Sequence, residues 1–271
     1  MPTRKERYSL KGGRAGYDRL AILARKYWPH TSALLDRVGL RSGMRFADLG
    51  CDGGRVSLEV AKRVGNQGQV VGIDIDPVSL DLARTAAQEQ GLTNVTFRDQ
   101  RVQEWNEPDA YDMVYTRALL QHLSDPVGVI RRMWHAVKPG GTIIVEDADH
   151  DGWFCHPPNP GFDTFRRVFL ATIDRGGGDH AFGRKIYRAM TAAGVPPPTL
   201  ALITLCYLEG DEKTLAWSSL DAVSDFAVKE GIATAAEVQS ALDDLGKYTQ
   251  DPTTLIGGPF YFQAYAHKPT G

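Results

Sequence analysis

Short apolar runs alternate with amphipathic segments through the first half of the chain. The apolar runs predict strands, which cover residues 45–49, 70–74, 95–98, 111–116 and 142–146. Apolar positions at helical spacing before and between these runs predict helices, which cover residues 17–38, 56–64, 78–90 and 127–137. This alternation of strand and helix is typical of an α/β protein with a parallel, doubly wound sheet and helices on both faces.

The pattern changes after residue 150, where an aromatic- and proline-rich stretch interrupts the alternation. Further helices are predicted over residues 162–175 and 182–193. A strand is expected within residues 200–208, and an alternating last strand is expected over residues 259–266. Between these two strands, residues 211–248 have a wholly helical pattern.

Composition is that of an ordinary globular enzyme. The 271 residues carry 31 Lys and Arg against 33 Asp and Glu, for a formal net charge of −2. Such a balance argues against a nucleic acid partner, and a hydrophobic content of 42% supports one sizeable domain.

The three cysteines are widely spaced, which argues against a disulfide framework or a zinc cluster. A charged N-terminus without a following apolar run predicts no membrane segment and a cytoplasmic location.

Acids and glycines follow the first two predicted strands. The first strand ends in the segment Asp48-Leu49-Gly50-Cys51-Asp52-Gly53-Gly54, and the second ends in Asp74. Small residues let a backbone approach a ligand closely, and the start of the following helix offers free N–H groups. Gly50 and Asp74 lie about one βαβ step apart, the spacing that places a carboxylate on a ribose diol. The two segments together predict a site for a nucleoside-containing cofactor.

Two kinds of cofactor compete for this site. A dinucleotide fingerprint G-x-G-x-x-G needs glycine at the positions of Asp52 and Arg55, and the carboxylate of Asp48 would repel a diphosphate. Asp48 suits a cationic ligand instead. The segment resembles the first motif, acid-x-G-x-G-x-G, of the class I S-adenosylmethionine-dependent methyltransferases, with Asp52 replacing the middle glycine. Aspartate tolerates left-handed backbone better than most residues, so this departure is compatible with the turn.

The resemblance extends over nearly the whole chain and is to the small-molecule, bacterial type of this family. Segments similar to its motifs cover residues 46–54, 72–76, 95–101, 111–116, 120–126 and 138–141. It implies a Rossmann-like, seven-stranded sheet with an antiparallel last strand, in a single domain over residues 1–271. It also implies a helical lid over residues 1–40 and a helical insertion or cap over residues 211–250 near the substrate pocket. A packing role for that insertion, without substrate contact, fits equally well.

The resemblance implies S-adenosyl-L-methionine as cofactor and S-adenosyl-L-homocysteine as product. Asp74 is expected to accept both ribose hydroxyls, and Ile75 to pack on the adenine. In the third motif Arg101 replaces the expected acid, so the adenine amino group is left to Asp99, Gln100 or a backbone carbonyl. The full set of expected cofactor-binding residues is Tyr8, Asp48, Gly50, Cys51, Asp52, Asp74, Ile75, Gln100, Arg101, Thr116 and Arg117. For Tyr8, an ordinary buried tyrosine is an equally good interpretation.

Methyl transfer requires an acceptor held in line with the methyl group, and an oxygen or nitrogen acceptor can also require a base. His122 is the first candidate base because it follows the fourth strand, against the strong alternative that it only organises that loop. Asp149 follows the fifth strand and is the second catalytic candidate, with a solvated loop position as the alternative. No metal is expected, because Arg117 at the end of the fourth strand opposes a cation.

Aromatic residues of the second half can line a hydrophobic pocket that accepts a ring. The expected pocket residues are Trp153, Phe154, His156, Phe165 and Trp217, although core packing fits the phenylalanines well. The predicted function is methyl transfer to an oxygen or nitrogen of a small, partly aromatic metabolite of secondary metabolism. Cyclisation with the same cofactor and a cofactor-binding module without catalysis remain alternatives. The expected partner is a small-molecule substrate, without nucleic acid or membrane, and a homodimer remains open.

Overall fold

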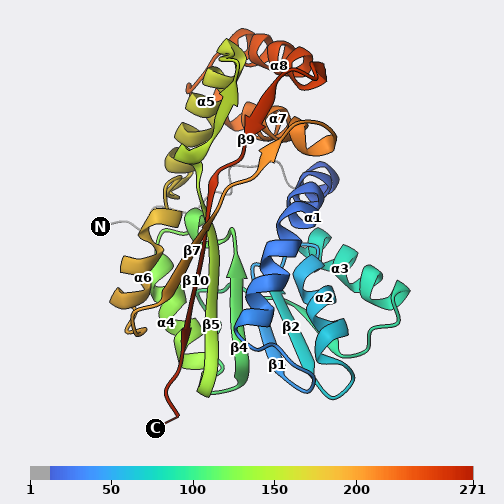
Figure 1. Cartoon of the computed structure of the whole chain (residues 1–271), viewed down its shortest axis with the longest axis vertical. Helices are drawn as coiled ribbons and strands as arrows, with labels where there is room; N and C mark the ends of the chain where they lie inside the picture. The colour runs from blue at the N-terminus through green and yellow to red at the C-terminus, as the bar shows by residue number, and fades with distance from the viewer. Residues whose placement is uncertain (1–12, 271) are drawn as a thin grey trace.

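The computed structural model describes residues 13–270, with side chains from residue 21 onward, and the alternation produces one large sheet flanked by helices (Figure 1). Its strands are β1 (Arg45–Leu49), β2 (Gln69–Asp74), β3 (Val95–Asp99), β4 (Tyr111–Arg117), β5 (Val137–Asp149), β7 (Thr199–Ile203) and β10 (Phe260–His267). The strand order is β3-β2-β1-β4-β5-β10-β7. Within this sheet β10 runs in the direction opposite to that of the other six strands. The predicted doubly wound, seven-stranded sheet with an antiparallel last strand is therefore confirmed.

Helices cover both faces of this sheet. One face carries α1 (Gly13–Arg37), α2 (Arg55–Val64) and α3 (Pro77–Glu89), and the other carries α4 (Pro126–Ala136) and α6 (Ile186–Ala192), as Figure 1 shows. Successive strand side chains point to opposite faces. Phe46 of β1 accordingly packs in the core under α2 and α3, whereas Ala47 packs in the core under α4 and α6.

A third layer stands above the carboxyl ends of the strands (Figure 1). It contains α5 (Pro160–Gly176), α7 (Leu215–Lys229) and α8 (Ala235–Gln250), which pack on one another around a core of their own. Three short strands accompany these helices in the order β6-β9-β8: β6 (Phe154–His156), β9 (Leu255–Gly257) and β8 (Cys206–Tyr207). Among the described residues, no helix has the length and apolar character that crossing a membrane requires.

Several predicted elements of the second half are corrected by the structure. The single strand expected within residues 200–208 is divided between β7 of the large sheet and β8 of the small one. The long helical stretch breaks after α7, because a capping box of Thr234 and Glu237 begins α8. Four single-turn helices complete the described chain: η1 (Leu120–His122), η2 (His150–Gly152), η3 (Gly183–Lys185) and η4 (Asp211–Thr214).

A buried carboxyl group joins α1 to the large sheet. Glu146 of β5 is only 1% exposed and accepts hydrogen bonds from Thr31 of α1 at 2.7 Å, Tyr115 of β4 and Gln263 of β10. A buried acceptor of this kind is costly unless donors satisfy it. Because the three donors come from three different elements, this carboxyl group fixes the position of α1 against β4, β5 and β10.

Replacing Thr31 with valine should lower the free energy of unfolding by about 1–3 kcal/mol, because a buried acceptor loses a donor while the side-chain volume is kept. Chemical denaturation followed by circular dichroism would measure this change. Thr85→Val is the matched control, since Thr85 is an exposed helical threonine whose hydroxyl donates to the carbonyl of Asp81. Equal stability of the two variants would contradict a structural role for the Thr31–Glu146 hydrogen bond.

Candidate functional site

A cavity of about 470 Å³ lies between the carboxyl ends of the strands and the helical layer. This volume is within the range of small-molecule and cofactor sites, and the carboxyl edge is where open α/β sheets bind ligands. Nine predicted site residues line it: Asp48, Gly50, Cys51, Asp52, Asp74, Ile75, Arg117, His122 and Trp153. Residues that the sequence did not single out for the site also line it, among them Tyr27, Gln121, Leu215, Ser219 and Tyr261.

The turn after β1 folds back over the end of β2. The backbone N–H groups of Gly50 and Cys51 donate to the carbonyl of Ile73, at 2.8 and 3.1 Å. Gly50 has a φ of 72°, and a Cβ there would come within 3.0 Å of the Leu119 side chain. Asp52 also has a left-handed φ of 46°, so aspartate does adopt the backbone conformation that the resemblance assigns to a glycine.

Asp74, the last residue of β2, is held in one orientation by backbone donors. Its Oδ2 accepts the N–H of Asp52 at 2.9 Å, and its Oδ1 accepts the N–H groups of Ile75 and Asp76 at 2.7 and 3.1 Å. Oδ2 therefore keeps an acceptor position for an incoming hydroxyl. A second hydroxyl donor would share Oδ2 or displace a backbone N–H group, which is a tighter arrangement than the sequence suggested. Ile75 is 55% exposed at the mouth of the cavity.

These contacts also argue against a diphosphate ligand. A phosphate-binding loop needs N–H groups directed at the ligand. Here the N–H groups of Gly50, Cys51 and Asp52 are engaged by β2, and that of Gly54 donates to the Cys51 carbonyl at 2.9 Å. The carboxylates of Asp52 and Asp74 face the same space, so the electrostatics favour a cation over an anion.

Asp48, near the end of β1, supplies a third carboxyl group to this half of the cavity. It is 3% exposed, and the hydroxyl of Ser57 on α2 donates to it at 2.6 Å. Burial raises the pKa of Asp48 to about 6, although the Ser57 hydrogen bond and the Arg117 guanidinium act in the opposite direction. Burial likewise raises the pKa of Asp52, with a contribution from the neighbouring carboxylate of Asp74. The carboxyl group of Asp48 therefore becomes ionised as the pH rises through about 6.

The other half of the cavity is aromatic. Tyr27 of α1 stacks on Tyr261 of β10, with ring centroids 4.2 Å apart. Trp153 follows η2. Phe169 of α5 packs edge-on against the ring of His150, with ring centroids 5.1 Å apart. The helix α7 adds Leu215 and Ser219. The first turns of α7 therefore reach the cavity, while α8 packs behind α5 and α7.

A chain of hydrogen bonds fixes the polar edge of the aromatic half. The indole Nε1–H of Trp153 donates to Nδ1 of His150 at 3.0 Å, and Nε2 of His150 lies 2.8 Å from Oε1 of Gln121. An indole N–H can only donate, so Nδ1 is the acceptor and the imidazole proton resides on Nε2. His150 is therefore neutral, and Gln121 must present its carbonyl oxygen to the ring.

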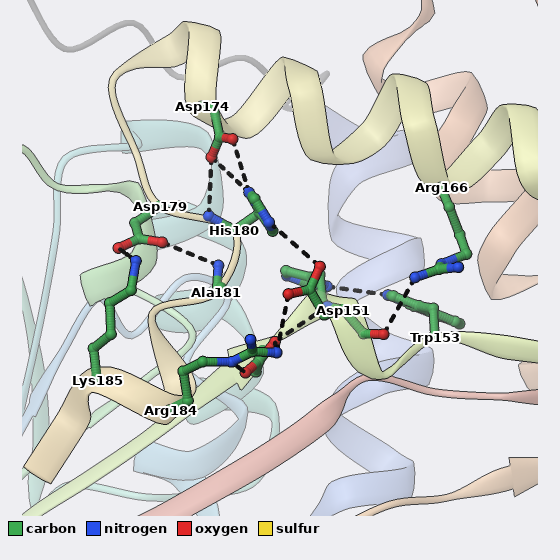
Figure 2. Close-up of polar contacts among 11 residues, drawn as sticks. Asp151, Trp153, Arg166, Asp174, Asp179, His180, Ala181, Arg184 and Lys185 are labelled. Carbon is green, nitrogen blue, oxygen red and sulfur yellow. Dashed lines mark hydrogen bonds and ion pairs between the residues drawn. The ribbon is translucent and has the colours of Figure 1, made fainter.

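Asp149 does not line the cavity, which corrects its predicted catalytic role. Its carboxylate is 1% exposed and forms an ion pair with Arg184, whose Nη2 lies 2.8 Å from Oδ1. It also caps η2 by accepting the backbone N–H of Asp151 at 3.1 Å. Figure 2 shows Arg184 and His180 converging on Asp151 from the segment after α5. Asp149 thus anchors that segment behind the cavity, where its charge is compensated.

Three further residues of the expected cofactor site do not line the cavity. Thr116 is fully buried, and its hydroxyl donates to the Leu49 carbonyl at 2.8 Å, joining β4 to β1. Gln100 donates its backbone N–H to the carbonyl of Asp74, and Arg101 is exposed beside Glu104. Tyr8 and the first part of the predicted lid lie outside the described residues.

Four expected pocket residues are also placed elsewhere. Phe165 is fully buried between other rings of the helical layer, so the core interpretation holds for it. Phe154 and Trp217 are 42% and 38% exposed, and His156 is exposed on β6. Among the side chains that the structure describes, from residue 21 onward, no three His, Cys, Asp or Glu gather in a way that would hold a metal ion.

Comparisons with known proteins agree with this geometry. Residues 40–166 match the family model described as a methyltransferase domain. The ubiquinone biosynthesis O-methyltransferase of Aeromonas salmonicida (strain A449) is 34% identical over 114 residues, which are 41% of this chain and 46% of that protein. The chain thus spans about half the length of the curated relatives it matches.

Solved structures with the same fold include proteins of different description. A protein of Bacillus halodurans C-125 described as a methyltransferase has a TM-score of 0.62 at 17% identity, covering 88% of this chain and 98% of that chain. The [4+2]-cyclase SpnF has a TM-score of 0.53 at 21% identity, covering 90% of this chain and 82% of that chain. The matched domain over residues 40–166 and the acid-lined turn are thus similar to those of S-adenosylmethionine-dependent methyltransferases, and the solved structures share the fold.

Proposed function

We propose that this chain binds S-adenosylmethionine in the acidic half of the cavity and transfers its methyl group to a small molecule in the aromatic half. The observation that carries the proposal is the continuity of the two halves. One cavity runs from Asp74 at the end of β2 to Trp153 and Phe169 beneath the helical layer. A methyl donor and an acceptor can therefore lie in contact within it, which is the proximity that transfer requires.

The residues of the acidic half fit the cofactor. Asp74 would accept from the ribose hydroxyls, and Ile75 would pack on the adenine. Asp48 would face the ammonium group of the methionine moiety, beside the turn at Gly50. When bound, the cofactor supplies a methyl group that is already strongly electrophilic.

The chain's own contribution is then binding, orientation and exclusion of water. Tyr27 and Tyr261 form an aromatic wall on one side, and Trp153 and Phe169 on the other, which favours a small, partly aromatic acceptor. His122 lines the cavity after β4 and is the proposed base for an acceptor oxygen or nitrogen. His150 is not available for that role, because the proton on its Nε2 is directed at Gln121 and its Nδ1 accepts from Trp153.

The direct test is incubation of the protein with S-adenosylmethionine and a panel of phenols and aromatic amines, followed by mass spectrometry. The expected result is S-adenosylhomocysteine together with an acceptor heavier by one CH₂ unit. Conversion of an added compound without a mass gain would favour a cyclase-type reaction instead. Absence of any binding of S-adenosylhomocysteine would contradict the proposal as a whole.

Asp74→Asn should weaken binding of S-adenosylhomocysteine by about 10- to 100-fold, because hydrogen bonds to a charged acceptor are replaced by weaker ones. Isothermal titration calorimetry gives the dissociation constants. Asp81→Asn is the matched control, since Asp81 is an exposed carboxylate of α3 that pairs with Arg84 and does not line the cavity. A loss of affinity in both variants would point to general damage of the fold.

Binding of S-adenosylhomocysteine should also depend on pH through Asp48. The carboxyl group attracts the ligand's ammonium only when ionised, so affinity should rise as pH increases through about 6. At pH 5 about one tenth of the group is ionised, which predicts affinity about tenfold weaker than at pH 7.5. Calorimetric titrations from pH 5 to 8 measure this profile. An equally steep profile in Asp48→Asn would assign the pH dependence to another group.

A further inference from the structure

Gln121 contributes a primary amide group to the lining of the cavity. Gln121 is 4% exposed and lines the cavity. Its backbone is held on both sides: its N–H donates to the buried carboxyl group of Asp147 at 3.2 Å, and its carbonyl accepts the N–H of Asp179 at 2.7 Å. The side chain therefore starts from an immobilised backbone, and its direction depends on one further contact.

That contact is with His150, and it determines which end of the amide faces the cavity. Because Trp153 can only donate, His150 carries its proton on Nε2, and Oε1 of Gln121 must accept it. The amide nitrogen consequently points away from His150. Among the described residues, no group accepts a hydrogen bond from this nitrogen. The nitrogen is also not one of the fully buried side-chain atoms that lack a hydrogen-bond partner. It therefore opens on the cavity that Gln121 lines.

Hydrogen bonds also hold the backbone of His150 and of Asp151 in place. The N–H of His150 donates to the carbonyl of His180 at 2.9 Å, and Arg166 donates to the carbonyl of Asp151 at 3.3 Å. Figure 2 shows Asp151 at the centre of this network, with His180, Arg184 and Trp153 around it. Since the imidazole cannot shift easily, Gln121 cannot easily exchange its oxygen and nitrogen.

We infer that Gln121 recognises a carbonyl-type oxygen on the methyl acceptor. A buried primary amide that offers only N–H groups selects an acceptor, and a ligand lacking one leaves those N–H groups unpaired. Gln121 follows β4, and its partner His150 follows β5. Asp74, the proposed partner of the ribose, ends β2 on the other side of β1. The donor thus faces the aromatic half. This inference rests on the proposed function, because it names the chemical class of the substrate.

The tautomer of His150 can be tested without any ligand. Nitrogen-15 NMR of the full chain should show a neutral imidazole at His150 with the proton on Nε2. Trp153→Phe removes the indole donor and should allow the other tautomer to be populated, so Trp153 acts as a positioning residue. An imidazolium, or a proton on Nδ1, in the wild-type protein would overturn the assignment of the amide.

The preference for a carbonyl oxygen can be tested with the three isomeric hydroxyacetophenones, each paired with the corresponding ethylphenol. Ligand-observed NMR titrations on the complex with S-adenosylhomocysteine give the dissociation constants. At least one ketone should bind about tenfold more tightly than its ethyl counterpart, and Gln121→Met should abolish this preference. Gln239→Met, an exposed glutamine of α8, is the matched control and should keep the preference. Trp153→Phe should reduce it.

Equal binding within every pair, or no binding by any ketone, would overturn the inference. A loss of S-adenosylhomocysteine affinity in Gln121→Met would overturn it too, because the amide would then contact the cofactor. Should the wild-type protein fail to bind S-adenosylhomocysteine, the proposed function fails separately, and the ketone preference is then measured on the protein alone. Titration of the hydroxybenzoates alongside distinguishes a charged carboxylate from a neutral carbonyl group.

Discussion

The buried carboxyl group of Glu146 is the constraint on which the cavity depends. Its three donors lie on α1, β4 and β10, so none of these elements can move away without leaving an acceptor unpaired in the interior. The same elements carry Tyr27, Arg117 and Tyr261 into the cavity. One buried polar group, placed where the sheet meets α1, thereby sets the distance between two walls of the site.

At its other end α1 contacts the helical layer more weakly. Arg25 and Lys26 form ion pairs with Glu212 of η4 at 3.0 and 3.2 Å, and both basic side chains are substantially exposed. Because the basic partners of the largely buried Glu212 are exposed, these ion pairs contribute less to stability than the buried hydrogen bonds to Glu146. The sheet side of α1 is therefore held by fully buried polar contacts, and its η4 side by partly exposed ones.

Local patterns predicted the sheet and the acidic half of the cavity well. Asp48 and Asp74 are identified by their place at strand ends, and parallel strands bring their carboxyl ends to one edge. Thr116 was misplaced because neighbouring strand residues face opposite sides, and only the structure shows that Arg117 is the one facing the cavity. Asp149 was misplaced because its partner, Arg184, lies 35 residues further along the chain.

The aromatic half of the cavity could not be predicted from local sequence patterns. Its walls come from segments far apart in sequence, such as Tyr27 and Tyr261, whose stacking no local pattern reveals. The orientation of Gln121 depends on a donor 32 residues away, through the tautomer of a histidine. The acidic half is built from two segments at the ends of β1 and β2, whereas the aromatic half depends on long-range contacts, so the two halves can be altered independently. Substitution in the helical layer can therefore change the aromatic half without disturbing the carboxylates of Asp48 and Asp74.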